Sequence, residues 1–415
     1  MTSEEDPPDE VRKSPSRRFR HTLRMHDLSR RNFDLAYLAN VMGLYCESGA
    51  GRAIKVEDEE VTDFVRCSYL GLDRHPKVVA GAIREIEKFQ AVQWSCSRNR
   101  LNYSVLDELE GCLSAIWRGR VIVFTSVTLA NFAGISLLAS GLLTRAVPRV
   151  VVFDGQCHAS LQILRPIVAD ETSVETVRPG DYARLESICK RHKDVVFVTD
   201  GVNSMGGAAD IEHLTFIQGR YGLMLYIDDA HGISIQGDNG CGYTRSRVPH
   251  DLGERTIIAV SLSKGFGASG GALLVGTKKQ EQTIRRFAPP YGFSAIPSVP
   301  AVGAALGSAS VHASEEIYER QRELSKRIEI FDSALRTADA GNGLPVRFVT
   351  MGNEKKAIRI AGALLRSGFY VMAAFFPTVA RGRAGIRISL TSEHRLESIR
   401  KLTGELRKML STDNP

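Results

Sequence analysis

Lys264 is the residue whose place in the sequence most directly suggests chemistry. It lies in the segment SLSKGFGASGG, directly after the apolar run TIIAV and before a glycine-rich turn. A lysine at a buried strand end with small neighbours can lose its charge through desolvation, and its neutral amine can then form a Schiff base with a carbonyl compound. Lysines in loops rich in serine and glycine are also commonly exposed to solvent, so this position alone leaves both interpretations open.

A second candidate group lies in the segment IDDAHG. Asp228 follows the apolar run LMLYI, and His231 comes three residues later. A carboxylate at the end of a strand can keep a heterocyclic ring nitrogen protonated through a charge-assisted hydrogen bond. The alternative is structural, because Asp228 or Asp229 could instead cap the N-terminus of a helix.

Both groups follow short apolar runs that are rich in β-branched residues and separated by turns or helical patterns. This alternation predicts an α/β fold, in which helices cover both faces of a mostly parallel sheet. Ligands of such sheets bind at the carboxyl ends of the strands, so the site is expected just after these runs. The predicted strands are VIVFTS from Val121, VVVF from Val150, VVFVTD from Val195, LMLYIDD from Leu223, TIIAVSLS from Thr256 and GALLVG from Gly271.

The pattern changes after about Pro297. Long amphipathic helical patterns follow, then the strand-like runs VRFVTM and GIRISL, and a final helix from about Leu396. This indicates a smaller α+β domain. We therefore expect residues 1–60 to form a polar tail and arm, disordered over about the first 20 residues, residues 61–297 to form the large domain, and residues 298–415 to form the small C-terminal domain.

Composition excludes several classes of protein. The chain has 415 residues, of which 43% are hydrophobic and 24% charged, values typical of a folded globular protein. The net charge of +7 is too small an excess to indicate nucleic-acid binding without a basic motif. The seven cysteines contain no CxxC pair, so neither a disulfide framework nor a metal site is predicted. Without a signal sequence or an apolar stretch of ~20 residues, we expect a cytoplasmic protein with no membrane segment.

Seven segments between about Val56 and Leu410 occur in the order found in one enzyme family. They are CSYLGLDRHPKVVAGA, LDELEGCLSAIW, FDGQCHASL, TDGVNSMGGAADI, YIDDAHGISIQGDNGCGY, SLSKGFGASGGALLVG and FFPTVARGRAGIRISLTSEH. On these segments the chain resembles the α-oxoamine synthase family of fold-type I pyridoxal-phosphate enzymes, which includes aminooxononanoate synthase, aminolevulinate synthase and serine palmitoyltransferase. The resemblance implies an aspartate-aminotransferase-like fold, with a mostly parallel seven-stranded sheet domain and a smaller C-terminal α+β domain. It also implies pyridoxal 5'-phosphate as the cofactor.

The resemblance implies roles for residues around the cofactor ring. Lys264 would form the Schiff base with the cofactor and move the proton at the substrate α-carbon. Asp228 would pair with the pyridinium nitrogen and keep it protonated. His158 would stack on the ring face, although taken alone it could be a structural core histidine. His231 would hydrogen-bond the phenolic oxygen of the ring, and Ser204 lies where the family has a serine near that oxygen.

The same resemblance implies where the phosphate and the substrate bind. In TSVTLAN, Ser126 and the backbone amides of Val127 and Thr128 would meet the phosphate at a helix N-terminus, where unpaired N–H groups and the helix dipole favour an anion. Ser261 would also hydrogen-bond the phosphate. Arg387 would hold the carboxylate of an amino acid bidentately, although taken alone it could be a charge on the surface of a strand.

The implied reaction joins an amino acid to an acyl thioester of CoA or an acyl carrier protein. Carbon dioxide is lost and an α-aminoketone forms. The resemblance also implies a homodimer with shared active sites, in which Ser294 of the neighbouring chain is the candidate for a further phosphate contact.

Other functions remain open at this point. The same fold supports aminotransferases and aldolase-type lyases, and some assemblies include non-catalytic partner subunits, against which Lys264 argues. The sequence departs from the family at Val127, Thr128 and Leu106 and in the glycine-free segment SCSRNRLNY. These departures leave the amino acid and the acyl donor open. The segments SCSRNRLNY and FFPTVARGRAGIRISL resemble those of the family branch that makes long-chain aminoketone signals in bacterial quorum sensing.

Overall fold

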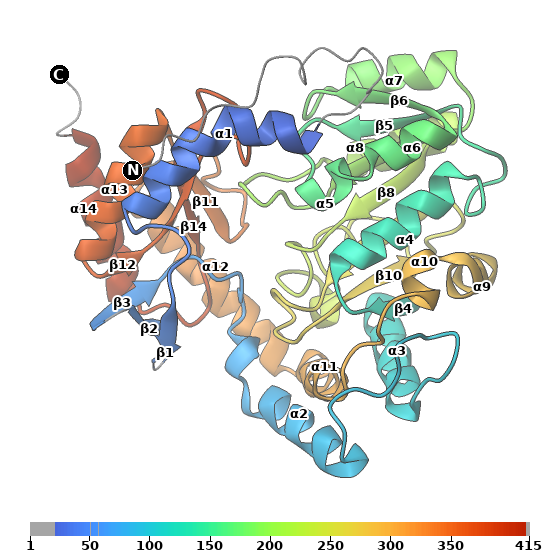
Figure 1. The fold of residues 1–415 in the computed structure, drawn as a ribbon, viewed down its shortest axis with the longest axis horizontal. Coiled ribbons are helices and arrows are strands. Elements are labelled where there is room, and N and C mark those ends of the chain that lie inside the picture. The colour runs from blue at the N-terminus through green and yellow to red at the C-terminus, as the bar shows by residue number, and fades with distance from the viewer. Residues whose placement is uncertain (1–20, 50, 57, 412–415) are drawn as a thin grey trace, which may run out of the picture.

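The computed structural model describes residues 21–49, 51–56 and 58–411, so the expected disorder of the first 20 residues lies outside the described part (Figure 1). A seven-stranded sheet forms its centre. The strands are β4 (Arg120–Phe124), β5 (Val150–Asp154), β6 (Ser173–Val177), β7 (Val195–Asp200), β8 (Met224–Asp228), β9 (Thr256–Ser261) and β10 (Gly271–Val275). Their order is β4-β10-β9-β8-β7-β5-β6. Only β10 runs against its neighbours in the sheet, which confirms the predicted large and mostly parallel sheet.

Each of the six runs predicted as strands lies in this sheet, and the structure adds β6, which the sequence did not predict. β6 lies at the edge of the sheet, beside β5. Most of its residues, SVETV, are exposed or half-buried. An edge strand that buries few side chains lacks the continuous apolar run of a central parallel strand. Its sequence therefore carries only a weak strand signal.

Alternate side chains of the strands in the large sheet face two separate hydrophobic clusters. In β4, Val121 and Val123 belong to one cluster, whereas Ile122 and Phe124 belong to the other. Successive side chains of a strand point to opposite faces, so both faces must be covered by helices. The first face is covered by α3 (Ser104–Trp117), α7 (Tyr182–Arg191), α8 (Ile211–Tyr221) and α11 (Val299–His312), and the second by α4 (Val127–Ala139), α5 (Ala159–Gln162), α6 (Arg165–Glu171), α9 (Lys278–Phe287) and α10 (Pro289–Gly292).

Helix α2 (Pro76–Phe89) packs closely on α11 because both helices have a glycine at the contact. A Cβ atom on Gly81 would lie 2.2 Å from the carbonyl oxygen of Gly303, and a Cβ atom on Gly303 would lie 2.2 Å from that of Gly81. Backbones this close leave no room for a side chain at either position. The two glycines therefore determine how closely these helices approach.

Two smaller sheets lie beside the large one (Figure 1). Their orders are β11-β14-β13 and β1-β2-β3-β12. Their strands are β1 (Cys46–Ser48), β2 (Ala53–Val56), β3 (Glu59–Asp63), β11 (Val346–Gly352), β12 (Phe369–Tyr370), β13 (Met372–Ala374) and β14 (Ala384–Ser389). The neighbouring helices are α1 (His21–Leu38), α12 (Glu316–Ala334), α13 (Glu354–Arg366) and α14 (Leu396–Ser411). In the described ranges, no helix combines the length and the apolar character needed to cross a membrane.

The smaller part of the molecule combines segments from before residue 70 with segments of the C-terminal region. β12 pairs in parallel with β3, and one hydrophobic cluster contains Phe64 and Tyr69 together with Ile386 and Leu402. The sequence predicted the α+β character of the C-terminal region but not its packing against residues before 70. The predicted domain boundaries, after residues 60 and 297, stay a prediction.

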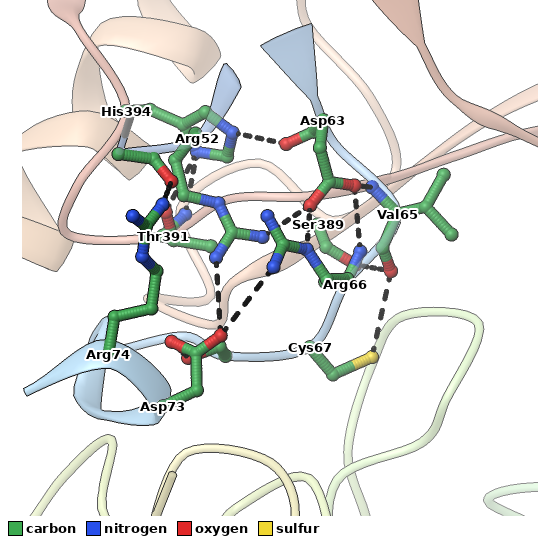
Figure 2. Close-up of polar contacts among 12 residues, drawn as sticks. Arg52, Asp63, Val65, Arg66, Cys67, Asp73, Arg74, Ser389, Thr391 and His394 are labelled. Carbon is green, nitrogen blue, oxygen red and sulfur yellow. Dashed lines mark hydrogen bonds and ion pairs between the residues drawn. The ribbon is translucent and has the colours of Figure 1, made fainter. Parts of the chain in front are cut away.

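A buried carboxylate organises the chain where it leaves β3 (Figure 2). The oxygens of Asp63 accept hydrogen bonds from the N–H of Val65 at 2.8 Å and from the N–H of Arg66 at 3.1 Å. Asp63 also pairs with Arg52 Nη2 and Arg66 Nε, each at 2.5 Å. Burial alone would raise the pKa of Asp63, but Arg52 and these hydrogen bonds hold it below its ordinary value. The turn that leads to Cys67 is therefore held from several sides.

Candidate active site

Lys264 lies in the turn after β9, which packs closely against a neighbouring segment. Its carbonyl oxygen accepts a hydrogen bond from the N–H of Gly267 at 2.9 Å. Gly267 has a φ of +75°, and a Cβ atom there would lie 2.4 Å from the Cβ of Leu72, so the position requires glycine. The Lys264 residue is half-buried. Burial lowers the pKa of both His158 and His231, and the charge of Lys264 adds to the effect, so the predicted lysine lies near both predicted histidines.

Asp228 is the last residue of β8, and its buried carboxylate accepts hydrogen bonds from two donors. Its Oδ2 accepts from Nδ2 of Asn131 at 2.7 Å, and its Oδ1 accepts from the N–H of Ala230 at 2.9 Å. A turn follows rather than a helix, which excludes the helix-capping alternative. A carboxylate offers about four acceptor sites, so Asp228 can take a further donor.

Asn131 holds Asp228 in place, and the sequence motifs did not point to it. This fully buried side chain on α4 also accepts a hydrogen bond from the hydroxyl of Tyr226 at 2.9 Å and donates to Ser160 Oγ at 3.0 Å. An amide inside the apolar helix VTLANFAGISLLA was the signal that could have found it, because buried polar groups are almost always hydrogen-bonded.

Asp200 lies beside Asp228 at the carboxyl ends of β7 and β8, where the two residues are register partners. Its carboxylate oxygens accept from the N–H of His158 at 3.2 and 3.1 Å. Burial, and then the charge of Asp228, raises the pKa of Asp200 well above its ordinary value. Asp200 therefore holds a proton more readily than a free carboxyl group does.

His158 is the N-cap of α5, and its ring is held from one side. Its Nδ1 lies 2.9 Å from Ser160 Oγ. Burial lowers the pKa of His158, the charge of Asp228 opposes this effect, and Lys264 adds to it. The neutral form of the imidazole is therefore favoured relative to a free histidine.

His231 is buried after β8 and pairs with a tyrosine. Its Nδ1 lies 2.6 Å from the hydroxyl oxygen of Tyr69. Burial lowers the pKa of His231 well below its ordinary value, and the charges of Lys264 and Arg387 lower it further. A neutral imidazole has two ring nitrogens that can form hydrogen bonds, so Nε2 can still meet a second partner. Tyr69 lies in the segment CSYLGLDRHPKVVAGA, but no pattern in that segment singles it out.

Arg387 lies on β14 and is only 4% exposed, which excludes the alternative of a surface charge. Its Nε donates to the carbonyl oxygen of Ser204 at 2.5 Å, its Nη1 to Ser389 Oγ at 2.9 Å, and its Nη2 to Cys67 Sγ at 3.4 Å. A guanidinium has five N–H donors; these three contacts use three of them, and the Tyr69 hydroxyl is a further hydrogen-bonding neighbour. The structure thus connects Ser204 to Arg387 through its backbone.

Ser126, Val127 and Thr128 form the start of α4. Ser126 is the N-cap, and its Oγ accepts from the N–H of Leu129 at 3.3 Å. The N–H groups of Val127 and Thr128 lie in the first turn, where a helix has no carbonyl acceptor for them. These groups and the helix dipole together favour an anion.

Ser261 lies at the same end of the sheet as the start of α4. It is buried at the end of β9 and is the register partner of Gly271 on β10. A Cβ atom on Gly271 would lie 2.2 Å from the backbone nitrogen of Val127. Glycine therefore allows the start of α4 to lie directly on β10, next to Ser261.

The chain belongs to the aminotransferase class I and II family, whose family model matches residues 171–406. Curated relatives include two 8-amino-7-oxononanoate synthases. The protein of Citrobacter koseri is 31% identical over 371 residues, which cover 85% of this chain and 91% of that protein. The protein of Arabidopsis thaliana is 30% identical over 363 residues, which cover 83% of this chain and 74% of that protein.

Solved structures show the same fold. Serine palmitoyltransferase from Sphingomonas wittichii matches with a TM-score of 0.82 at 20% identity, over 94% of this chain and 98% of that chain. An 8-amino-7-oxononanoate synthase from Francisella tularensis matches with a TM-score of 0.69 at 21% identity, over 86% of this chain and 99% of that chain. The predicted resemblance to the α-oxoamine synthases and the predicted fold-type I architecture are confirmed. The chain is an acyltransferase-type enzyme, and its cofactor is pyridoxal 5'-phosphate.

The residues of the site fit this cofactor. The start of α4 offers N–H donors to a phosphate group, and Asp228 can still accept a hydrogen bond from a ring nitrogen. Lys264 supplies an amine on the turn after β9, a strand that lies between β4 and β8 in the order of the sheet. An anion site, a carboxylate and an amine are the three groups that a phosphorylated pyridine aldehyde requires.

Proposed function

We propose that the protein condenses an amino acid with an acyl thioester, releases the thiol and carbon dioxide, and forms an α-aminoketone. The observation that supports this most strongly is the buried guanidinium of Arg387, whose charge, like that of Lys264, lowers the pKa of His231, so that both cations lie at the same site. A bidentate guanidinium is the group best suited to hold a carboxylate. The 8-amino-7-oxononanoate synthases among the relatives support the choice of reaction.

In this proposal each side chain has one task at the substrate or the cofactor. When bound, pyridoxal 5'-phosphate supplies the electron sink for negative charge at the substrate α-carbon. Lys264 binds the cofactor and moves the α-proton, and Asp228 keeps the ring nitrogen protonated. His158 packs on the ring face and His231 hydrogen-bonds its phenolic oxygen through Nε2. Arg387 orients the substrate carboxylate, so that the bond to be broken has a defined direction.

The phosphate group of the cofactor is assigned to the start of α4. The N–H groups of Val127 and Thr128, the Ser126 hydroxyl and the Ser261 hydroxyl are its proposed donors. The carbonyl oxygen of Ser204 accepts a hydrogen bond from Arg387. Its hydroxyl is proposed to lie near the phenolic oxygen of the cofactor. A homodimer in the cytoplasm, with Ser294 of one chain near the other chain's site, completes the proposal.

The test is a comparison of Lys264→Ala with Lys279→Ala, which changes an exposed lysine on α9. Each protein is supplied with pyridoxal 5'-phosphate, a panel of amino acids and a panel of acyl-CoA thioesters, and both thiol and carbon dioxide are measured. Unmodified protein and Lys279→Ala should release the two together for one substrate pair. Lys264→Ala should lose at least about a hundredfold in rate, since acid–base catalysis alone contributes that much.

Other products would identify another reaction of the fold. A keto acid formed without free thiol would indicate an aminotransferase, and an aldehyde formed from a hydroxyamino acid would indicate a lyase. Borohydride reduction of the cofactor-loaded protein should attach the cofactor at Lys264. Attachment at a different lysine would refute the assignment of the nucleophile.

A further inference from the structure

Cys67 contacts the guanidinium that is assigned to the substrate, but the function proposed above gives it no task. Its Sγ accepts a hydrogen bond from Arg387 Nη2 at 3.4 Å. On its other side the thiol lies 3.9 Å from the carbonyl oxygen of Val65 (Figure 2). The other charged or titratable groups that act on it are Tyr69, two residues along the chain, and Lys264, on the turn after β9.

The contact between Cys67 and Arg387 is held by a shared frame. Ser389 accepts a hydrogen bond from Arg387 Nη1 at 2.9 Å and donates one to the carbonyl oxygen of Val65 at 3.3 Å. The N–H of Val65 is in turn bound by the buried carboxylate of Asp63. The guanidinium and the backbone that leads to Cys67 are therefore joined through β14 and the turn after β3.

Charge also links the two groups. Burial would raise the pKa of the Cys67 thiol, but Arg387, Tyr69 and Lys264 together hold it below its ordinary value. Burial would lower the pKa of Arg387, but the neighbouring Cys67 and Tyr69 raise it. A thiolate at this position is thus stabilised by the same positive charge that a substrate carboxylate would use.

We propose that Cys67 is a positioning residue that controls Arg387 through its own proton. As a thiol, Cys67 leaves the charge of Arg387 for the substrate carboxylate. As a thiolate, it neutralises the guanidinium and repels the carboxylate, because two anions in a buried site share one positive charge. This inference rests on the proposed function, since it requires Arg387 to bind a carboxylate.

Cys96 is the matched control in this chain. Its Sγ also contacts an arginine, with Arg100 Nη1 at 3.3 Å, but this pair is exposed to solvent. Water and salt weaken interactions between exposed charges. The two cysteines therefore share a contact with an arginine of nearly the same length and differ in burial.

The experiment measures amino-acid affinity against pH from the absorbance change of the bound cofactor, in the holoenzyme and in the Cys67→Ser and Cys96→Ser variants. Serine keeps the size of the side chain and does not ionise in this range. Affinity in the unmodified protein and in Cys96→Ser should fall about tenfold for each pH unit above the pKa of the thiol. Cys67→Ser should lack this decrease, whereas titration of the substrate amine affects all three proteins equally.

A second measurement follows the thiol directly. The ultraviolet absorbance of the thiolate, taken as the difference between each protein and its Cys67→Ser counterpart, should appear at lower pH with Arg387 in place than in Arg387→Ala. An equal thiolate titration in both backgrounds would overturn the inference.

The outcomes separate the inference from the proposed function. If no amino acid binds the holoenzyme at any pH, the proposed function fails and the task of Cys67 fails with it. If amino acids bind but Cys67→Ser has the same pH profile as the unmodified protein, only the task of Cys67 is refuted.

Discussion

At the scale of single residues, environment separates two carboxylates that occupy equivalent places in the sheet. Asp200 and Asp228 end neighbouring parallel strands and face each other in register. Asp228 accepts a hydrogen bond from the side chain of Asn131, and Asp200 accepts from the side chain of Asn203 and the N–H of His158. Burial, and then the charge of Asp228, raises the pKa of Asp200. The same residue type at two neighbouring strand ends thus has different partners, and Asp200 holds a proton more readily than a free carboxyl group does.

Arg387→Ala should weaken amino-acid binding while the cofactor stays bound. The proposed contacts of the cofactor do not include Arg387, and loss of one partner of a buried charge pair commonly costs ~2–5 kcal/mol. The measurement is amino-acid affinity, taken from the cofactor absorbance of the variant. Arg383→Ala, an exposed residue of the same segment, is the control and should bind as the unmodified protein does. An unchanged affinity in Arg387→Ala would show that the carboxylate is held elsewhere.

At the scale of elements, the start of α4 is placed by its contact with β10. The helix begins at Val127, after the N-cap Ser126, and Gly271 lies directly beneath it. The position of the proposed phosphate site therefore depends on Gly271, a strand residue that donates no hydrogen bond to it. A short helix-to-strand distance brings the unpaired N–H groups next to the end of β9, where Ser261 lies.

Gly271→Ala should lower both stability and cofactor affinity. The new Cβ would lie 2.2 Å from the nitrogen and 2.4 Å from the Cα of Val127, and backbone atoms can move away only if α4 shifts. Overpacking of this kind commonly costs 1–3 kcal/mol, so we expect about that loss in the free energy of unfolding. Chemical denaturation and cofactor titration would measure the two effects.

Gly404→Ala is the control for this substitution. Gly404 lies in α14 with no other atom within 4 Å of the position of a Cβ, so alanine should stabilise the helix by up to ~1 kcal/mol. If Gly271→Ala binds the cofactor as tightly as Gly404→Ala does, the start of α4 is not the phosphate site.

At the scale of the whole molecule, exposed apolar side chains gather on two segments that touch each other. Val92, Trp94 and Leu101 lie on one segment and Phe293, which is 91% exposed, on the other. The segments are joined by a hydrogen bond from the N–H of Ile296 to the carbonyl oxygen of Ser95 at 3.3 Å. Clustered apolar surface is typical of an interface between proteins.

The expected homodimer is therefore assigned to this surface. Sedimentation should give twice the mass of one chain, and Phe293→Asp should shift the protein toward the monomer and reduce its activity, because Ser294 of the partner would leave the site. Phe216→Asp changes another exposed phenylalanine, on α8, and should leave the dimer intact. A fully active monomer at high dilution would contradict the assignment.

The sequence by itself determined the class of the protein, the strands of the central sheet except β6, and the candidate groups Lys264 and Asp228. These follow from local patterns, because a buried parallel strand is a continuous apolar run and the groups that react follow its end. The order of the motifs then identified the family, which the relatives confirm.

Only the tertiary structure decided which side chains meet. Cys67 and Arg387 are 320 positions apart, and Tyr69 and His231 are 162 apart. The partner of a polar side chain depends on how strands and turns are brought together, and hydropathy patterns carry no information about such distant pairs. For the same reason, the sequence predicted a carboxylate-binding Arg387 but not the thiol that shares its charge.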